Sequence, residues 1–155
     1  MSLRENTMRK VIKAYERLPF EDLFFDNTFY NPLTKEKAGK LAKSLEMVRL
    51  APSAINKQPW RVVISDNNTH FYLKRNKGFT RNEQLDMQMF DMGIALCYFS
   101  LTAKENGLNI KFIQDEPKFL SNSEVEYIAS YTLIWIVMLL NPLIFNQWVF
   151  YLLYF

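Results

Sequence analysis

A long segment near the middle of the chain, residues 82–106, has apolar residues at every third or fourth position, the spacing of one helical face. Its centre, MGIALCYFSL, is apolar nearly all round, so a helix here must be buried on most sides. A chain of 155 residues has the size of one ordinary domain. We therefore expect a central core helix, or a helix shared with a partner subunit. The repeating positions are Leu85, Met89, Met92, Leu96, Phe99 and Ala103.

The segments around this helix alternate between helical and strand patterns. Helical spacing is found at 4–17 and at 35–50, where Thr34 is the expected N-cap and Pro52 ends the helix. Strands rich in β-branched and aromatic residues are predicted at 60–65, 69–74 and 109–114. The first two form a hairpin around an Asp-Asn-Asn turn, and Gly107 stops the long helix. Residues 18–34 are expected to be an ordered, packed loop. The order of elements predicts an α+β fold.

Composition excludes several classes of protein. The net charge is only +3 and no dense Lys/Arg run is present, so we expect no nucleic-acid partner. The single cysteine, Cys97, cannot form an internal disulfide and is expected to be buried and inert. The N-terminus has no apolar signal region, and a reducing cytoplasm is the expected compartment. His70 is the only histidine, so we predict no metal site and expect a surface or edge-strand residue.

A loop of specific chemistry, APSAINKQPW at 51–60, connects the predicted helix 35–50 to the first predicted strand. Pro52 fixes the backbone, and the small side chains of Ser53 and Ala54 let a planar ligand come close. Asn56 and Gln58 carry amides that both donate and accept hydrogen bonds. Such a loop suits a flat ring with a mixed donor and acceptor edge. By itself, it is equally typical of a tight connection stiffened by two prolines.

The loop resembles the Ala-Pro-Ser-x-x-Asn-x-Gln-Pro-Trp signature of the nitroreductase superfamily, which binds FMN. The segment MQMFDMGIALCYFSLTAKENGLNIKF resembles the long central helix of that family, and SEVEYIAS resembles its next strand. Together, LPFEDLFF and LEMVRLAPSAINKQPWR are most similar to the branch labelled "putative nitroreductase", related to a Thermotoga protein. The resemblance covers about residues 18–131. It implies a partial nitroreductase-like α+β fold: helix, β-hairpin, long central helix and further strand.

The resemblance also implies an activity. An intact relative uses FMN for two-electron transfer from NAD(P)H to nitro or quinone-like acceptors. The flavin itself carries the hydride, so no catalytic side chain is expected. In the resembled family the cofactor site lies at a dimer or pseudo-dimer interface, and a homo-oligomer is expected here. The implied FMN-binding residues are Pro52, Ser53, Ala54, Asn56 and Gln58.

One part of the family pattern is missing. The resembled family carries an Arg-rich segment, of the type Arg-Arg-Ser-x-Arg, which clamps the FMN phosphate. No such run occurs here, and LRENTMRK does not replace it. We therefore expect the chain to begin after that segment, and to bind FMN without its main charged partner. The alternative interpretation is a truncated, catalytically inactive nitroreductase-fold fragment.

The C-terminal residues differ sharply from the rest. Every Asp, Glu, Lys and Arg lies at or before Glu126. We therefore divide the chain into a nitroreductase-like domain at 1–131 and an apolar tail at 132–155. The tail is either a membrane anchor, a buried strand or helix pair within a dimer, or the product of a shifted reading frame, which is the hypothesis we favour. The middle of the tail is interrupted by Asn141, Pro142, Asn146 and Gln147, which weakens the membrane interpretation.

A few charged residues near the loop and the long helix remain. Asp86 and Asp91 lie five positions apart, so they do not share a helical face as a carboxylate pair would. Asp91 can cap or pair with an interior polar group, and we expect its role to be structural. Arg49, Lys57 and Arg61 flank the loop, and each is expected to be a solvated charge or an ion-pair partner rather than a phosphate ligand.

Overall fold

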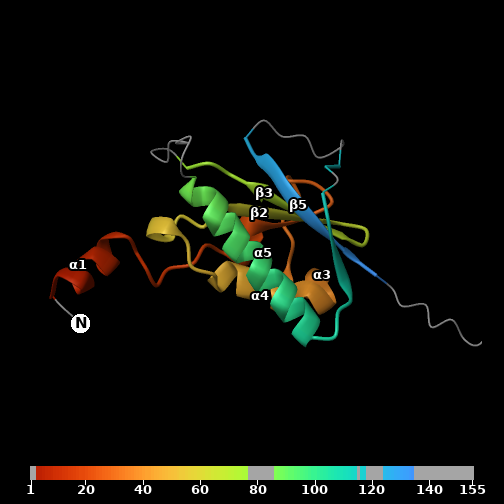
Figure 1. Ribbon diagram of the computed structural model, residues 1–155, viewed down its shortest axis with the longest axis horizontal. Helices are drawn as coiled ribbons and strands as arrows, with labels where there is room; N and C mark the ends of the chain where they lie inside the picture. Colours follow the sequence, from red (N-terminus) through yellow and green to blue (C-terminus); the bar gives the residue numbers. More distant parts are fainter. Residues whose placement is uncertain (1–2, 77–85, 115, 118–123, 135–155) are drawn as a thin grey trace, which may run out of the picture.

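The structure, a computed structural model, describes residues 3–76, 86–114, 116–117 and 124–134. The strands are β1 Phe24–Asp26, β2 Trp60–Ser65, β3 Asn68–Leu73, β4 Ile110–Ile113 and β5 Glu126–Leu133. The helices are α1 Leu3–Val11, α2 Phe20–Leu23, α3 Lys35–Ala38, α4 Ala42–Leu50 and α5 Met87–Glu105, with 3-10 turns η1 Gly39–Leu41 and η2 Ala54–Asn56. The strands form one mixed sheet, and α4 and α5 cover one of its faces (Figure 1). This architecture confirms the predicted α+β fold.

The sheet has the strand order β1-β2-β3-β5-β4. Strands β2 and β3 form the predicted hairpin, with Trp60 opposite Leu73 and a turn in which Asp66 has φ +54°. Strand β5 pairs antiparallel with both β3 and β4, and β1 pairs parallel with β2. Strand β1 and helix α2 lie inside 18–34, which the sequence predicted to be a loop. The strand is only three residues long, too short to show an alternating pattern.

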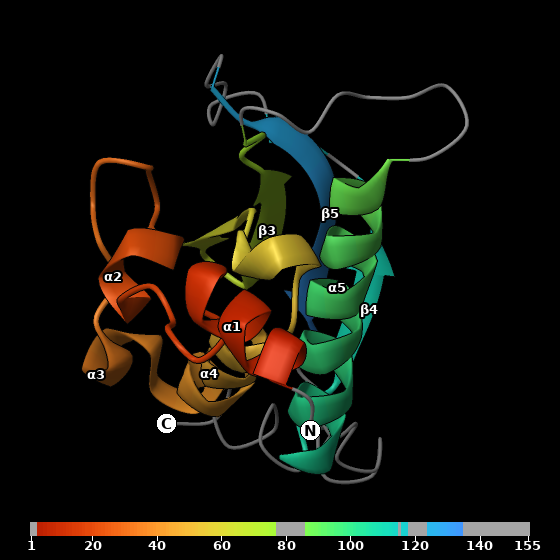
Figure 2. The same ribbon diagram turned by 90° about the vertical axis from the view of Figure 1, so that its left-hand side faces the viewer.

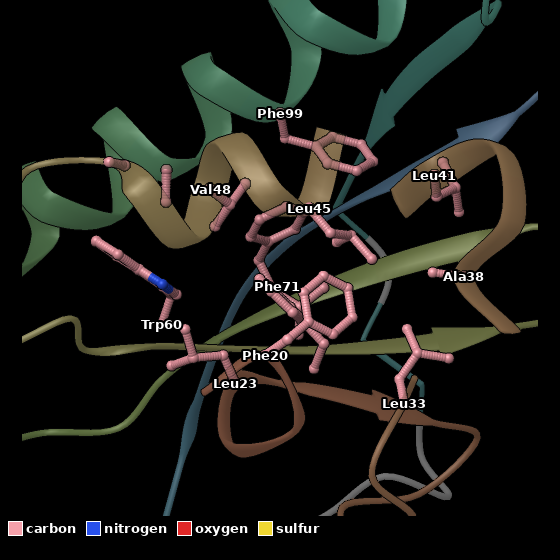
Figure 3. Packing of buried hydrophobic residues seen from close by; sticks show 14 of the residues in the cluster. Phe20, Leu23, Leu33, Ala38, Leu41, Leu45, Val48, Trp60, Phe71 and Phe99 are labelled. Carbon is pink, nitrogen blue, oxygen red and sulfur yellow. The ribbon is translucent and has the colours of Figure 1, made fainter. Parts of the chain in front are cut away.

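The main core lies between the sheet and helices α4 and α5. Figure 3 shows Leu45 and Val48 of α4 and Phe99 of α5 packed toward Phe71 of β3. The Phe71 and Phe99 rings meet edge to face, with centroids 5.3 Å apart. Burying each side chain of this size contributes about 1.5–3 kcal/mol. The predicted helical stripe of 35–50 therefore does face the core.

The predicted helix at 35–50 is interrupted. Thr34 is its N-cap, as predicted, because the Lys37 backbone N–H donates to the Thr34 hydroxyl over 3.3 Å. Gly39 has φ +52° and ψ −123°, a conformation that ends α3 and that residues other than glycine rarely adopt. The chain then passes through η1 into α4, which ends just before Pro52.

Helix α5 is the predicted long helix, with its first predicted positions 82–85 outside the described residues. Asp86 caps it, accepting hydrogen bonds from the backbone N–H groups of Gln88 and Met89, and Gly107 ends it at φ +73°. The helix buries one side against α4 and the sheet (Figure 2). Its opposite side is exposed, so the expectation of burial on most sides is wrong for a single copy of the chain.

Cys97 lies on that exposed side of α5. The prediction of a buried cysteine is therefore wrong. The cause is helical position, because Cys97 is one turn from Gly93 and Ile94 and two turns from Phe90, on the side that faces away from α4 and the sheet.

His70 is only 3% exposed, which corrects the prediction of a surface or edge-strand residue. Strand β3 is the central strand of the sheet, so neighbouring side chains of β2 and β5 flank His70. Its Nδ1 atom lies 2.7 Å from the Ser130 hydroxyl on β5. That hydroxyl is also 2.9 Å from the Tyr127 hydroxyl. His70 is thus part of a structural hydrogen-bond network on the sheet face away from α5.

Residues 135–155, which make up most of the predicted apolar tail, lie outside the described residues. The three interpretations of that tail therefore stay predictions. Over the ranges that the structure does describe, no helix is both long enough and apolar enough to cross a bilayer.

Candidate functional site

A pocket of about 630 Å³ lies between the N-terminal segment 11–19 and the loop at 51–60. Ligand pockets in proteins span about 300–1,000 Å³, so the volume suits a small cofactor or substrate. We call this the loop pocket. It is lined by Val11, Ile12, Lys13, Glu16, Arg17, Leu18, Pro19, Ile55, Asn56, Lys57 and Gln58.

The loop has an unusual backbone. Ile55, Asn56 and Gln58 all have positive φ, at 42°, 56° and 47°. Such angles are uncommon for residues other than glycine and exceptional for a β-branched residue such as Ile55. A backbone of this kind persists only where surrounding contacts hold it, and it concentrates at functional sites. Contacts with the rest of the fold must therefore hold this loop in its conformation.

Two hydrogen bonds fix the ends of this strained stretch. The Ala54 backbone N–H donates to Asp91 Oδ1 on α5 over 2.9 Å. The Gln58 backbone N–H donates to the Ser53 hydroxyl over 2.8 Å. Asp91 is 3% exposed, and this burial raises the pKa of its carboxyl, while the bond from Ala54 acts in the opposite direction. The prediction that Asp91 pairs with an interior polar group is confirmed, and the group is a backbone amide of the loop.

The Asn56 side chain binds the N-terminal segment with both ends of its amide. Its Nδ2 group donates to the backbone oxygens of Lys13 and Glu16, over 2.6 and 2.8 Å. Its Oδ1 atom accepts a hydrogen bond from Arg17 Nη1 over 3.1 Å. These contacts converge on the turn at 13–17.

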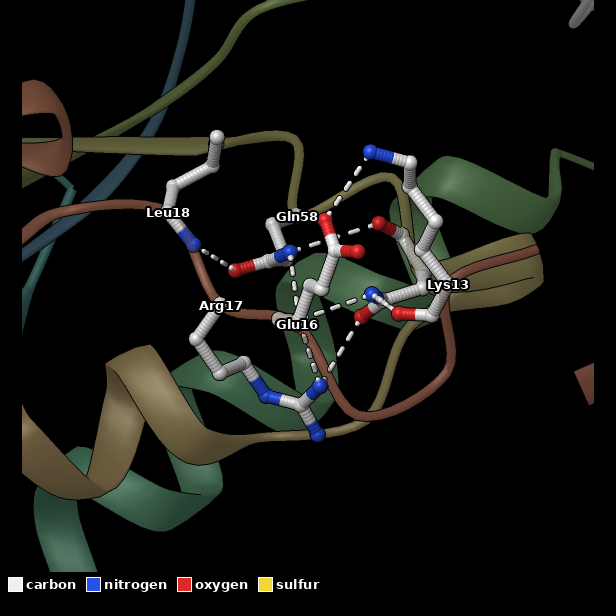
Figure 4. Close-up of polar contacts among 6 residues, drawn as sticks. Lys13, Glu16, Arg17, Leu18 and Gln58 are labelled. Atoms are coloured by element: carbon white, nitrogen blue, oxygen red, sulfur yellow. Dashed lines mark hydrogen bonds and ion pairs between the residues drawn. The ribbon is translucent and has the colours of Figure 1, made fainter. Parts of the chain in front are cut away.

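Gln58 also faces this segment. It is 3% exposed, and its Oε1 atom accepts from the Leu18 backbone N–H over 2.9 Å (Figure 4). Its Nε2 group makes longer contacts to the backbone oxygens of Glu16 and Asn56, at 3.5 and 3.4 Å. In this conformation, both amides that the sequence assigned to a ligand are engaged by the chain itself.

The structure thus brings two of the predicted residues, Asn56 and Gln58, together at the loop pocket. Pro52 is exposed, and Ser53 and Ala54 are half-buried beside the pocket, outside its lining. Ser53 and Ala54 shape the loop through the two backbone bonds described above.

Three cationic side chains surround the loop pocket: Lys13, Arg17 and Lys57. Lys13 is paired with Glu16 at 3.0 Å, so the local charge is positive but partly offset. Sequence reasoning missed Arg17, because its contacts with Leu50 and Asn56 join positions more than thirty residues apart. Within the described ranges, no group of three His, Cys, Asp or Glu side chains is placed to hold a metal ion.

The other flanking cations have structural partners. Arg49 forms an ion pair with Glu46 at 2.6 Å, and Arg61 donates to the backbone oxygens of Gln58 and Trp60. The ion pair raises the pKa of Arg49, and the hydrogen bonds from Arg49 lower the pKa of Glu46. The expectation of an ion-pair partner is confirmed for Arg49.

The fold and the loop define a chain of nitroreductase type, and comparison with known proteins agrees. The family model described as "Putative TM nitroreductase" matches residues 26–103, which is half of the chain. The chain belongs to this family. None of the curated proteins compared with it matches.

Two solved structures are similar to the chain. A nitroreductase family protein from Clostridium difficile 630 is 20% identical, with a TM-score of 0.55, and the match covers 84% of this chain and 86% of that one. This likeness shows that the fold is shared. A protein from Thermotoga maritima, described as a putative nitroreductase, is 24% identical with a TM-score of 0.43. That match covers 77% of this chain and 42% of the Thermotoga chain.

Proposed function

We propose that the chain is an FMN-dependent oxidoreductase of nitroreductase type, which transfers two electrons from NAD(P)H to nitro or quinone-like acceptors. Family membership supports the reaction class. The observation that carries the proposal is the loop pocket of about 630 Å³, which the strained signature loop and three cationic side chains enclose. A reducing cytoplasm, where NAD(P)H is available, is the compartment we propose.

The residues of the loop pocket fit FMN by their chemistry. FMN supplies the two-electron transfer when it is bound, and the protein supplies binding, orientation and charge. Lys13, Arg17 and Lys57 are suited to its phosphate, since charge-assisted hydrogen bonds to anions are the strong ones. The amides of Asn56 and Gln58 suit the donor and acceptor edge of the ring. We propose that Pro52, Ser53 and Ala54 give the ring a close, flat approach.

Binding through the two amides has a structural condition. Asn56 and Gln58 must exchange their hydrogen bonds to segment 13–18 for bonds to the cofactor. Because hydrogen bonds are exchanged one for another, the net cost is modest, about 0.5–1.5 kcal/mol for each bond that is not replaced.

We propose that two copies of the chain associate through the exposed side of α5. Phe90 and Leu101 on that side are 60% and 56% exposed. Together with Gly93, Ile94 and Cys97, they form an apolar stripe with a shallow hollow of about 450 Å³. An apolar helix face of this kind is typical of a subunit interface. A second copy of α5 would cover it with matching chemistry.

A second candidate is a catalytically inactive chain that keeps the fold without the cofactor. The observation in its favour is that segment 13–18 already binds both amides of the loop. In this case the loop acts as a structural clasp for the N-terminal segment, and the pocket has no flavin ligand.

A flavin titration distinguishes the two. The purified chain is titrated with FMN and, separately, with riboflavin, which lacks the phosphate, and flavin fluorescence is followed. We expect FMN to bind with quenched fluorescence and riboflavin to bind about tenfold more weakly, as the loss of one charged contact predicts. Asn56→Ala should weaken both, and the remote exposed Asn109→Ala should weaken neither. The absence of FMN binding would establish the inactive alternative.

A further inference from the structure

A second pocket, of about 400 Å³, lies on the sheet face that points away from α4 and α5. We call it the sheet pocket. It shares no lining residue with the loop pocket and spans the start of β2, the end of β3 and the start of β5. Its lining residues are Phe25, Phe29, Tyr30, Arg61, Lys74, Glu124 and Val125.

Arg61 is the polar centre of the sheet pocket. Side chains alternate along β2, so Arg61 points away from the core that contains Trp60. Its Nη1 group donates to the backbone oxygens of Gln58 and Trp60, over 3.1 and 2.6 Å. These bonds hold the guanidinium in place and leave Nε and Nη2, which meet no acceptor within the described part of the chain.

No carboxylate of the described residues neutralises this guanidinium directly. In the part of the chain that the structure describes, Arg61 forms no ion pair. Burial lowers its pKa, and the more distant Asp22 offsets this only in part. An oriented, half-buried arginine whose Nε and Nη2 groups meet no acceptor among the described residues is suited to a planar oxyanion, which it can bind through two parallel hydrogen bonds.

The remaining charges of the sheet pocket are balanced. Lys74 Nζ lies 3.4 Å from Glu124, so this pair contributes little net charge. Arg61 therefore sets the sign of the pocket, and a single negative charge on the ligand would match it. A polyanion such as a nucleotide triphosphate would be poorly neutralised here.

Aromatic rings form the other wall. Phe25 and Phe29 meet edge to face with centroids 5.7 Å apart, and Phe29 contacts Tyr72 in the same way at 5.0 Å. These contacts fix the Phe29 ring, while Tyr30 beside it is 92% exposed. An exposed tyrosine next to fixed aromatic rings offers a surface on which a flat ligand ring can pack.

We propose that the sheet pocket binds a small aromatic monocarboxylate, with its carboxylate on Arg61 and its ring against Phe25, Phe29 and Tyr30. This inference does not require the proposed FMN site, because the sheet pocket shares no lining residue with the loop pocket. If Arg61 only held the backbone oxygens of Gln58 and Trp60, its other donor groups would need no ligand.

The test uses the full chain, isotopically labelled, with benzoate as the probe and benzyl alcohol as its uncharged counterpart. We expect benzoate to shift the NMR signals of Phe25, Phe29 and Lys74, and benzyl alcohol to bind at least about tenfold more weakly. Arg61→Met should weaken benzoate binding by about tenfold or more. Lys111→Met, which removes an exposed positive charge on β4, should have no effect.

Tyr30→Ala keeps the test decisive if Arg61→Met fails to fold, because an exposed side chain can be removed without loss of core packing. It should weaken benzoate binding by several-fold. Equal binding of benzoate and benzyl alcohol would overturn the carboxylate assignment. Shifts that are absent from Phe25, Phe29 and Lys74, or unchanged binding in Tyr30→Ala and Arg61→Met, would overturn the site.

Discussion

The Arg17 guanidinium donates a hydrogen bond to Asn56 Oδ1 over 3.1 Å, although 39 positions separate the two residues. The same guanidinium donates to the backbone oxygens of Ala14, Glu16 and Leu50. One side chain therefore joins the N-terminal segment, the end of α4 and the signature loop. The hydrogen bonds of the Asn56 and Gln58 amides are therefore coupled to the position of the N-terminal segment. A change in either one can be measured at the other.

Removal of the Gln58 amide should loosen the N-terminal segment without unfolding the chain. In Gln58→Leu the Leu18 backbone N–H loses its acceptor, Gln58 Oε1. We expect the Leu18 amide to exchange with solvent at least about tenfold faster, which is the effect of losing roughly 1.4 kcal/mol of protection. Hydrogen exchange followed by NMR measures this. The Leu133 amide, which donates to the Asn67 backbone oxygen at the turn between β2 and β3, serves as the internal control.

Saturating FMN should also speed up hydrogen exchange of the Leu18 amide in the wild-type chain, if the side chains of Asn56 and Gln58 bind the cofactor in place of segment 13–18. Leu18 exchange that is unaffected by bound FMN would show that Gln58 is not a cofactor ligand. This outcome would leave FMN binding itself intact and would correct only the assignment of residues.

Asp91 should make the protein less stable as pH rises. Burial raises the pKa of the folded carboxyl above the ordinary value of 3.8, so the unfolded chain releases this proton at lower pH than the folded chain does. The contribution of Asp91 to the free energy of unfolding therefore falls as pH rises through the two pKa values, and is constant above them. Asp91→Asn keeps an acceptor for Ala54 and removes the buried charge, so we expect it to stabilise the fold at neutral pH by about 1 kcal/mol.

Urea unfolding of wild type and Asp91→Asn at several pH values measures this difference, which should vanish at acidic pH. Asp91→Ala is the matched comparison. It leaves the Ala54 N–H without its acceptor and should destabilise the fold by about 1–3 kcal/mol. A pH-independent effect of Asp91→Asn would contradict the raised pKa.

Asp86 should have the opposite pH dependence. The Arg75 guanidinium, 2.8 Å away, is the main cause that lowers the pKa of this carboxyl. The stabilisation is therefore present above the ordinary value of 3.8 and is lost as pH falls through the lower, folded pKa. Asp86→Asn preserves the N-cap of α5 but removes the ion pair, so we expect a loss of about 1 kcal/mol at neutral pH.

Thermal unfolding at neutral and acidic pH checks this expectation for Asp86→Asn. The stabilities of the wild type and of Asp86→Asn should become equal at acidic pH, where the wild-type carboxylate is protonated. Asp66→Asn, in the exposed hairpin turn, is the control, because it makes the same exchange of residue types away from Arg75. A loss for Asp86→Asn that persists in acid would indicate a defect in the cap rather than in the ion pair.

A charge on the apolar stripe of α5 should separate the two copies that we propose. Phe90→Glu places a carboxylate at a side chain that is 60% exposed, so a single chain should still fold. At the centre of an interface, loss of an aromatic contact and burial of a charge should raise the dimer dissociation constant by at least about tenfold. Sedimentation velocity over a range of concentrations measures it.

Met8→Glu is the matched control, because Met8 on α1 has a similar exposure of 59% and lies outside the stripe. A chain that is monomeric before any substitution would contradict the proposed association. A dimer that survives Phe90→Glu would move the interface to another surface.

Strongly periodic elements could be predicted from the sequence. The long helix, the β2–β3 hairpin and the Thr34 cap all follow from local spacing and from residue chemistry, and the structure confirms them. Strand β1 could not be predicted, because three residues show no period and the strand depends on pairing with distant β2. Gly39 was the available signal for the break between α3 and α4.

The candidate site was predicted in part. The loop at 51–60 was located by its residue types, and Asp91 was expected to have an interior partner. Arg17 and the engagement of the two amides by segment 13–18 depend on contacts between distant positions, which no local pattern reveals. Cys97 and His70 were placed wrongly for the same reason, since burial depends on which neighbours the fold supplies.

The position of β5 in the sheet has a consequence for how the protein is made. Strand β5 lies between β3 and β4, yet it follows both in the chain. During synthesis on the ribosome, neither neighbour can complete its pairing until residues 126–133 have left the exit tunnel. Until then the nascent chain carries β3 with one unpaired edge, the kind of surface that chaperones protect from aggregation.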